Sequence, residues 1–341
     1  MKILKLTFLI IILSVTFFCS KEDDSQPTKS IQEPVTITNV YVGGSQTING
    51  LEKATIWKNG VAELLNTNLT NESKVNSVFV SGNDVYAVGF EVIVNSRVAT
   101  LWKNGTKIQL EGSFSEACSV SVFKDVVYIS GQLVEKATFW VGINGVFEGN
   151  ELSSNNNSVA KSIFATNDGL VVNGIYVAGK IGANAWTWIS PGYNETIFTT
   201  PSVAESIFVR GTDVFVVANY DNAGVLNAKI LKNGTSQNSV VNNTAMYSVH
   251  GDNQNIYAVG ATNPNSVNSR AMIWENFIPK ELSPLFSMAN SVFVADKNVY
   301  VAGNMYDFVS LKFKACLWTN GTIQTLSNEK SETKSVFVTV K

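Results

Sequence analysis

Short apolar runs separated by polar turns dominate the sequence. Two runs rich in β-branched and aromatic residues, 77–80 and 84–88, are joined by a turn containing glycine and asparagine, which is typical of a hairpin. A third run, 98–102, ends in Asn104 and Gly105, a pair that favours a type I′ turn, and a fourth run follows. Four antiparallel strands in about 43 residues predict one blade of a β-propeller.

The same pattern returns along the chain and can be followed by two recurring marks. A serine opens the first run of each copy, and the six intervals between these serines cover 258 residues, an average of 43. The serines are Ser77, Ser119, Ser162, Ser206, Ser248, Ser291 and Ser335. In the third run an alanine stands three residues before a large apolar residue, as in Ala99 and Trp102, and this mark also occurs seven times. Seven copies at this period predict seven blades.

The two ends of the folded region predict how the ring closes. The chain stops after a lone first run, 334–341, whereas the folded region starts near Thr36 with a second run that has no first. Each end supplies what the other lacks, so we expect the C-terminal strand to join the N-terminal blade and remove the free ends of an open array. The predicted fold is all-β: a seven-bladed β-propeller with four antiparallel strands per blade over residues 36–341.

The first 35 residues carry export signals instead of blade repeats. Residues 1–18 place two lysines before an apolar run, as in a signal peptide too short to span a bilayer comfortably. Cys19 ends this run, and acidic residues follow. Here the sequence resembles a bacterial lipoprotein, and the acidic segment resembles the export tag of Bacteroidetes surface lipoproteins, although Phe18 stands where that family usually has a small residue.

This resemblance implies a lipid on Cys19, a flexible tether over residues 19–35 and an outer-membrane location with surface exposure. An ordinary secretory signal followed by an incidental cysteine is the alternative.

Composition and charge narrow the range of partners. Only 15% of the residues are charged, the formal net charge is −2 and no basic stripe occurs, so nucleic acid is not expected as a partner. Membrane contact is expected only through the lipid on Cys19. A single histidine and the lack of paired C-x-x-C motifs predict no metal and no cofactor. Cys118 and Cys316 fall in blades on nearly opposite sides of the ring, so both are expected to be free thiols. We also expect a monomer.

Two kinds of side chain could suggest a binding site but fit the repeat better. His250 occupies a position where five copies have phenylalanine, so packing between blades is expected, with a ligand or proton-transfer role as the alternative. Six tryptophans recur at one blade position and are expected in the core. Trp186 lies off that register and is kept as a candidate for ligand binding.

The residue directly before each blade serine is the main binding candidate. Links such as 90–97, 220–226, 261–270 and 304–312 vary, whereas the turns at the other side of the ring repeat, and varied loops on a rigid scaffold commonly build recognition sites. We expect seven unlike residues at the channel mouth on the varied side. They are Asn76, Cys118, Lys161, Glu205, Tyr247, Asn290 and Lys334. Random drift at a solvated rim would give the same pattern.

The sequence contains no G-x-S-x-G, H-E-x-x-H, phosphate-loop or calcium-loop motif, so we expect no enzyme activity and no catalytic residue. The motif V-Y-x-V-G followed by A-x-x-W-K-N-G resembles the repeats of uncharacterised bacterial surface lipoproteins and, more distantly, NHL-type blades. The resemblance covers residues 36–341 and implies a propeller without implying an activity.

Two functions stay open from the sequence. The favoured one is a non-enzymatic binding or scaffold protein for an extracellular glycan, peptide or protein. The alternative is an extracellular carbohydrate-active hydrolase or lyase that uses loop carboxylates, and two or three acids converging on one channel mouth would favour it.

Overall fold

The computed structural model describes residues 36–341 apart from 66–69, 168–172, 191–192, 198–199 and 238–240. The predicted signal peptide, Cys19 and the tether lie outside these described residues. The described part contains strands and no helix, and therefore no helix that could cross a membrane.

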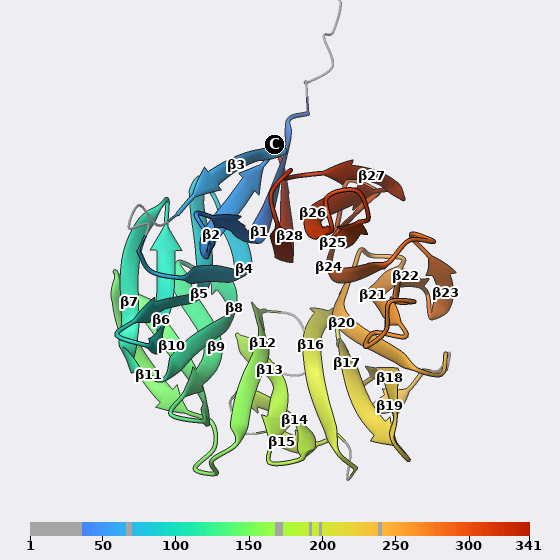
Figure 1. Ribbon diagram of the computed structural model, residues 1–341. Coiled ribbons are helices and arrows are strands. Elements are labelled where there is room, and N and C mark those ends of the chain that lie inside the picture. The colour runs from blue at the N-terminus through green and yellow to red at the C-terminus, as the bar shows by residue number, and fades with distance from the viewer. Residues whose placement is uncertain (1–35, 66–69, 168–172, 191–192, 198–199, 238–240) are drawn as a thin grey trace, which may run out of the picture. The chain divides into compact units, whose positions relative to one another are not determined.

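Seven four-stranded antiparallel sheets form a ring (Figure 1), as the repeat predicted. Blade 1 consists of β28 (Ser331–Val340), β1 (Thr38–Ile48), β2 (Leu51–Lys58) and β3 (Val61–Leu64). Blade 2 consists of β4 (Ser73–Ser81), β5 (Asp84–Ile93), β6 (Ser96–Lys103) and β7 (Thr106–Ser113). Blade 3 consists of β8 (Ser115–Phe123), β9 (Val126–Leu133), β10 (Lys136–Ile143) and β11 (Val146–Glu151).

The other four blades follow in chain order. Blade 4 consists of β12 (Ser158–Thr166), β13 (Gly174–Ile181), β14 (Asn184–Ser190) and β15 (Tyr193–Thr196). Blade 5 consists of β16 (Ser202–Arg210), β17 (Asp213–Asn222), β18 (Val225–Lys232) and β19 (Thr235–Ser236). Blade 6 consists of β20 (Thr244–Gly251), β21 (Ile256–Thr262), β22 (Arg270–Glu275) and β23 (Ile278–Glu281). Blade 7 consists of β24 (Ser287–Ala295), β25 (Asn298–Asp307), β26 (Lys312–Thr319) and β27 (Thr322–Thr325).

Blade 1 closes the ring by joining the two ends of the folded region. The C-terminal strand β28 pairs antiparallel with β1, from Thr38 opposite Val340 to Gln46 opposite Ser331. Two backbone hydrogen bonds extend this pairing, because Ile37 and Lys341 each donate an N–H to the other's carbonyl at 2.8 and 3.0 Å. The predicted closure by the C-terminal strand is confirmed.

In six of the seven blades the recurring serine bonds its blade to the next one. In blade 2, for example, Ser77 Oγ accepts the N–H of Val120 in blade 3 at 3.3 Å. Equivalent bonds of 3.1–3.3 Å are accepted by Ser162, Ser206, Ser248, Ser291 and Ser335. The serine recurs because each inner strand needs this acceptor, since a buried N–H without one is costly.

A second set of inter-blade serines was missed in the sequence. Ser73, the first residue of β4, accepts the N–H of Ala54 in blade 1 at 3.0 Å, so the recurring alanine of the third strand is a hydrogen-bonding position. The same bond is made by Ser115, Ser158, Ser202, Ser287 and Ser331. Six of the seven inner strands begin with one of these serines, whereas β20 in blade 6 begins with Thr244. In blade 2 the predicted strand start, Ser77, is four residues too late.

The recurring tryptophans pack between blades as predicted. The buried ones are Trp57, Trp102, Trp140, Trp188, Trp274 and Trp318. His250 also packs as expected, since its ring stacks on Phe293 with centroids 4.3 Å apart and lies 4.7 Å from Phe208. Its Nδ1 accepts the N–H of Val294 at 3.2 Å, which fixes the ring between blades 6 and 7.

Candidate functional site

A β-bulge in each inner strand builds the candidate site. In blade 2, Val75 pairs with Gly89 and Ser77 pairs with Val88, so Asn76 is left without a partner in β5. The same shift occurs in all seven blades. The bulged residues are the seven that precede the blade serines, and a bulge re-aims the side chain that it releases from the ladder.

A glycine in the second strand marks the bulge in six of the seven blades. A Cβ on Gly89 would lie 1.9 Å from the carbonyl oxygen of Lys74, so a side chain at this position would require the backbone to shift. Gly44 faces Glu332 O in the same way at 1.9 Å. The other glycines opposite a bulge are Gly131, Gly179, Gly260 and Gly303, and blade 5 has Ala218 there. The glycine of the V-Y-x-V-G motif is therefore the sequence signal of the bulge.

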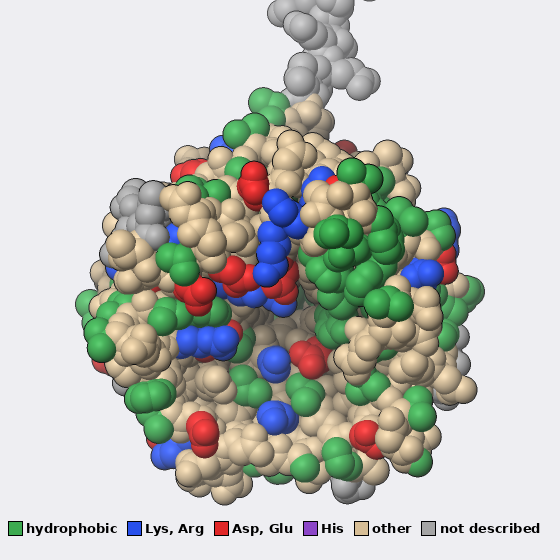
Figure 2. Space-filling view, in the orientation of Figure 1, with side chains coloured by type: hydrophobic (Ala, Val, Ile, Leu, Met, Phe, Trp, Pro, Cys, Tyr) green, Lys and Arg blue, Asp and Glu red, His purple; other side chains and the backbone are tan. Residues whose placement is uncertain are grey.

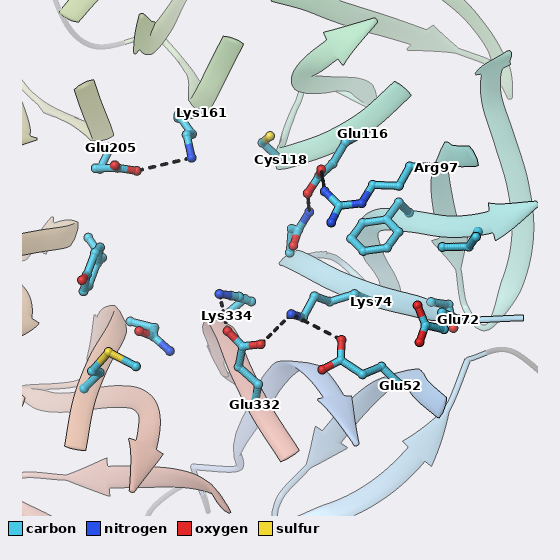
Figure 3. A pocket seen from close by; sticks show the side chains of 17 residues that line it. Glu52, Glu72, Lys74, Arg97, Glu116, Cys118, Lys161, Glu205, Glu332 and Lys334 are labelled. Carbon is cyan, nitrogen blue, oxygen red and sulfur yellow. Dashed lines mark hydrogen bonds and ion pairs between the residues drawn. The ribbon is translucent and has the colours of Figure 1, made fainter. Parts of the chain in front are cut away.

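All seven bulged residues line one pocket of about 610 Å³ at the channel mouth (Figure 3). The structure thus brings together every residue of the predicted ring, and their role in binding stays a prediction. Ten further residues complete the lining. They are Glu52, Glu72, Ser73, Lys74, Phe90, Val92, Arg97, Glu116, Met288 and Glu332. Most of these come from blades 1 to 3, so the pocket extends to one side of the ring.

The pocket wall at blades 1 and 2 is a connected group of charges. Lys74 Nζ lies 2.5 Å from Glu332 and 3.6 Å from Glu52, and Lys334 pairs with Glu332 as well (Figure 3). Burial alone would raise the pKa of the Glu332 carboxyl, but the two lysines outweigh burial and lower it. The carboxylate of Glu332 is therefore held ionised between two cations.

A second charged pair lies at blades 2 and 3. Arg97 Nη1 lies 2.6 Å from Glu116 Oε2, and the guanidinium is stacked 4.3 Å over the ring of Phe90. Asn76 donates its side-chain amide to Glu116 Oε1 at 2.9 Å and to the carbonyl of Ala117 at 3.0 Å. The bulged asparagine is thereby oriented by its neighbours before any ligand arrives.

The third charged pair crosses from blade 4 to blade 5. Lys161 Nζ lies 3.8 Å from Glu205 Oε2, and this carboxylate raises the pKa of the lysine. Burial, with a contribution from Glu205, raises the pKa of Tyr247 to about 12, and burial raises the pKa of the Cys118 thiol to about 12. Both groups are neutral at neutral pH, so Cys118 is a weak nucleophile.

Five glutamates and four cations therefore converge on one mouth of the channel. Four of the glutamates are ion-paired with a lysine or arginine, and these are Glu52, Glu116, Glu205 and Glu332. The charges nearly cancel, which leaves a pocket rich in hydrogen-bond donors and acceptors with little net field. Within the described part of the chain, no group of three or more histidine, cysteine or acidic residues is placed to hold a metal.

Trp186 lies elsewhere. It is a partly buried residue of β14 that packs against the cluster of Ala137, Ile163 and Trp188, and it is not among the residues lining the channel-mouth pocket. Trp186 is off the register of the repeated tryptophans, as the sequence showed. Its position in the sequence does not distinguish a packed ring from an exposed ring that could stack on a ligand.

The chain matches no family model and no curated protein sequence. Solved structures are similar to it. The β-propeller domain of the trilobed protease from Pyrococcus furiosus is 12% identical, over 86% of this chain and 92% of that chain, with a TM-score of 0.51. That propeller is described as having an open velcro topology, whereas β28 and β1 are paired here.

Two further structures are more distant in shape. An acylaminoacyl peptidase from Pyrococcus horikoshii is 12% identical over 86% of this chain and 51% of that chain, with a TM-score of 0.49. A thermostable family-43 glycoside hydrolase is 10% identical over 62% of this chain and 92% of that chain, with a TM-score of 0.38. Likeness at these identities shows a propeller fold and does not specify a reaction.

The expectation that the chain is not an enzyme is wrong. It rested on missing motifs, yet the similar propeller from Pyrococcus furiosus is a domain of a protease. The absence of a motif excludes only the chemistry that the motif carries.

Proposed function

We propose that the protein binds an extracellular glycan in the channel-mouth pocket. The observation that carries this proposal is the convergence of seven bulged side chains of five residue types, presented by seven equivalent backbone positions, on one concave site of about 610 Å³. A concave site with a few convergent polar groups is typical of small-ligand recognition.

The pocket charges favour a glycan over a strongly charged ligand. Lys74 and Glu332 already neutralise each other at 2.5 Å, and Glu116 is held by Arg97 at 2.6 Å. A charged ligand would have to break such pairs, and a partly buried charge without its partner is costly. Sugar hydroxyls can donate to the carboxylates and accept from the cations while the pairs persist.

Glycoside hydrolysis at the same site is a second candidate, favoured by the five converging glutamates. Hydrolysis requires one carboxyl to donate a proton and another to act as base or nucleophile. Prolonged incubation of the full chain with a bound polysaccharide, followed by analysis of reducing ends, tests this candidate. Product formation that is lost in both Glu205→Gln and Glu116→Gln would support hydrolysis, and an unchanged substrate would contradict it.

We also propose that the protein is a surface lipoprotein anchored through Cys19. The inner strand β28 begins at the pocket with Ser331 and Glu332, whereas β1 begins at the other end, with Thr38 opposite Val340. The first strand of the described chain, β1, therefore starts at the end of blade 1 that lies away from the pocket. Labelled palmitate should enter the wild type and protease should remove the protein from intact cells, whereas incorporation into Cys19→Ala would contradict the anchor.

A glycan microarray spanning plant, algal, fungal and animal polysaccharides, probed with the full chain, tests the binding function. Alanine at both Lys161 and Tyr247 should weaken binding about tenfold or more, because each removes a hydrogen-bonding group from the pocket. Asn104→Ala, on the opposite face, is the matched control and should leave binding unchanged. Equal binding by all three proteins, or no binding to any glycan, would contradict the proposal.

A further inference from the structure

Blade 7 carries a cluster of four aromatic side chains next to the pocket, which we call the aromatic shelf: Phe286, Tyr306, Phe308 and Phe313. Phe313 lies 4.9 Å from Phe286 and 5.2 Å from Tyr306, and Tyr306 lies 5.0 Å from Phe308, measured between ring centroids. Figure 2 shows a hydrophobic patch over this blade, beside the central hollow. None of the other links yields a comparable aromatic cluster among the described residues.

Phe308 is the exposed member of the shelf, the other three rings are partly buried, and hydrogen bonds hold the loop that carries Phe308. Phe308 is 62% exposed, and Val309 beside it is 95% exposed. Asp307 holds this loop, since it accepts the N–H of Val309 at 2.9 Å and the hydroxyl of Ser310 at 2.8 Å, and it pairs with Lys314 at 2.5 Å. Exposed apolar patches that are held in place commonly mark a binding surface.

A groove connects the shelf to the channel-mouth pocket. This cavity of about 290 Å³ is lined by Glu52, Met288, Asn304, Phe313, Lys330, Ser331 and Glu332. Glu52, Met288 and Glu332 also line the channel-mouth pocket. Phe313 belongs to the shelf, so the two surfaces are continuous.

The groove is amphipathic in cross-section. Phe313 and Met288 supply apolar surface, while Glu52, Lys330 and Glu332 supply charged groups. A pyranose ring has the same division, with an apolar face of C–H groups and an edge of hydroxyls. The apolar face can lie against an aromatic ring while the hydroxyls bond the charged groups.

We infer that the groove and the aromatic shelf form a second subsite, which binds the following sugar residues of an extended oligosaccharide whose end lies in the channel-mouth pocket. This inference rests on the proposed glycan-binding function and extends it from the channel-mouth pocket to a chain-binding site. Affinity should therefore depend on chain length.

Isothermal titration of the full chain with oligosaccharides of two to six residues tests the inference, using the cello-, malto- and chito-oligosaccharide series together with fragments of any microarray hit. In the series that binds, the hexasaccharide should bind about tenfold more tightly than the disaccharide. Phe313→Ala and the exposed Phe308→Ala should abolish this gain and leave disaccharide affinity unchanged. Phe114→Ala, which removes a 70% exposed phenylalanine from another link on the same face, is the matched control and should change neither affinity.

The remaining outcomes separate the two claims. Equal affinity for all chain lengths in the wild type would overturn the second subsite and leave the channel-mouth function standing. No binding at any length would overturn both. A displayed hydrophobic peptide that binds the shelf and is not displaced by the hexasaccharide would overturn the subsite in favour of a protein partner. Because Phe308 is exposed, Phe308→Ala keeps the test valid even if Phe313→Ala does not fold.

Discussion

The two faces of the propeller use the same repeat in opposite ways. On the face away from the pocket, the turns repeat both backbone and side chain: Asn104 has a positive φ of 50°, and its side-chain oxygen accepts the N–H of Val85 at 2.8 Å. The equivalent bonds are made by Asn59, Asn233, Asn276 and Asn320. On the pocket face the backbone of the bulge is repeated, but the seven bulged side chains are of five types: asparagine and lysine, each twice, and one each of cysteine, glutamate and tyrosine.

The difference shows where a repeated fold can vary without loss of structure. In these five turns the asparagine side chain itself completes the backbone hydrogen bonding, so its identity is fixed. In the bulge, two neighbouring positions have structural roles, as in blade 2. Ser77 accepts the hydrogen bond from the next blade, and Gly89 in the second strand leaves room for the bulged backbone. Asn76 between them is free of this structural requirement, and its role in binding stays a prediction.

The largest expected effect comes from removing part of the strand that closes the ring. Deleting residues 334–341 exposes the edge of β1 and removes Val336 and Val338, both 4% exposed, whose burial contributes about 3 to 6 kcal/mol. We expect unfolding or aggregation, measured by calorimetry and size-exclusion chromatography, while deletion of Lys341 alone should have little effect. A truncated protein with the same melting temperature as the wild type would show that closure by β28 does not stabilise the ring.

A smaller effect concerns His250 and pH. Burial lowers its pKa to about 4, below the value of about 6.5 expected in the unfolded chain. The unfolded state therefore takes up the proton first, and stability is lost as pH falls from about 6.5 to about 4, by on the order of 3 kcal/mol. His250→Phe, which installs the residue found in five other blades, should reduce the pH dependence of unfolding in denaturant across this window. An identical slope in wild type and variant would contradict burial of a neutral imidazole.

The inter-blade serines should have a smaller effect still. Ser206→Ala leaves the buried N–H of Val249 without its acceptor at 3.2 Å, so we expect a loss of about 1 to 3 kcal/mol in the free energy of unfolding. Ser130 is fully buried and its hydroxyl has no hydrogen-bond partner within the described structure, so Ser130→Ala is the matched control and should be nearly neutral. Equal losses for the two variants would mean that the serine matters for packing alone.

The smallest effect on stability is expected at the bulged residues themselves. Lys161→Ala removes a half-exposed side chain whose nearest carboxylate oxygen is 3.8 Å away, so its free energy of unfolding should change by less than about 1 kcal/mol. Asn104→Ala removes a turn acceptor and should cost more, about 1 kcal/mol. Thermal melts that rank the two in the reverse order would break the proposed distinction between the faces.

The sequence predicted the ring because its evidence is periodic. The spacing of Ser77 and its equivalents gave the blade count, and the unmatched ends gave the closure. The bulge was not predicted, because an extra residue in one strand leaves the spacing between copies unchanged, although Gly89 signals it. The aromatic shelf comes mainly from the link between β25 and β26, whose residues are not repeated in other blades. The ion pairs of Lys74 depend on how blades 1 and 2 meet, and the repeat does not encode that contact.

Hydrogen–deuterium exchange of the full chain, with and without the tightest-binding oligosaccharide, tests the central claim most directly. We expect slower exchange around the bulges, in residues 73–77, 115–119 and 331–335, and no change in the asparagine turns of the opposite face. Protection confined to those turns or to the outer strands would show that the channel mouth is not the binding site.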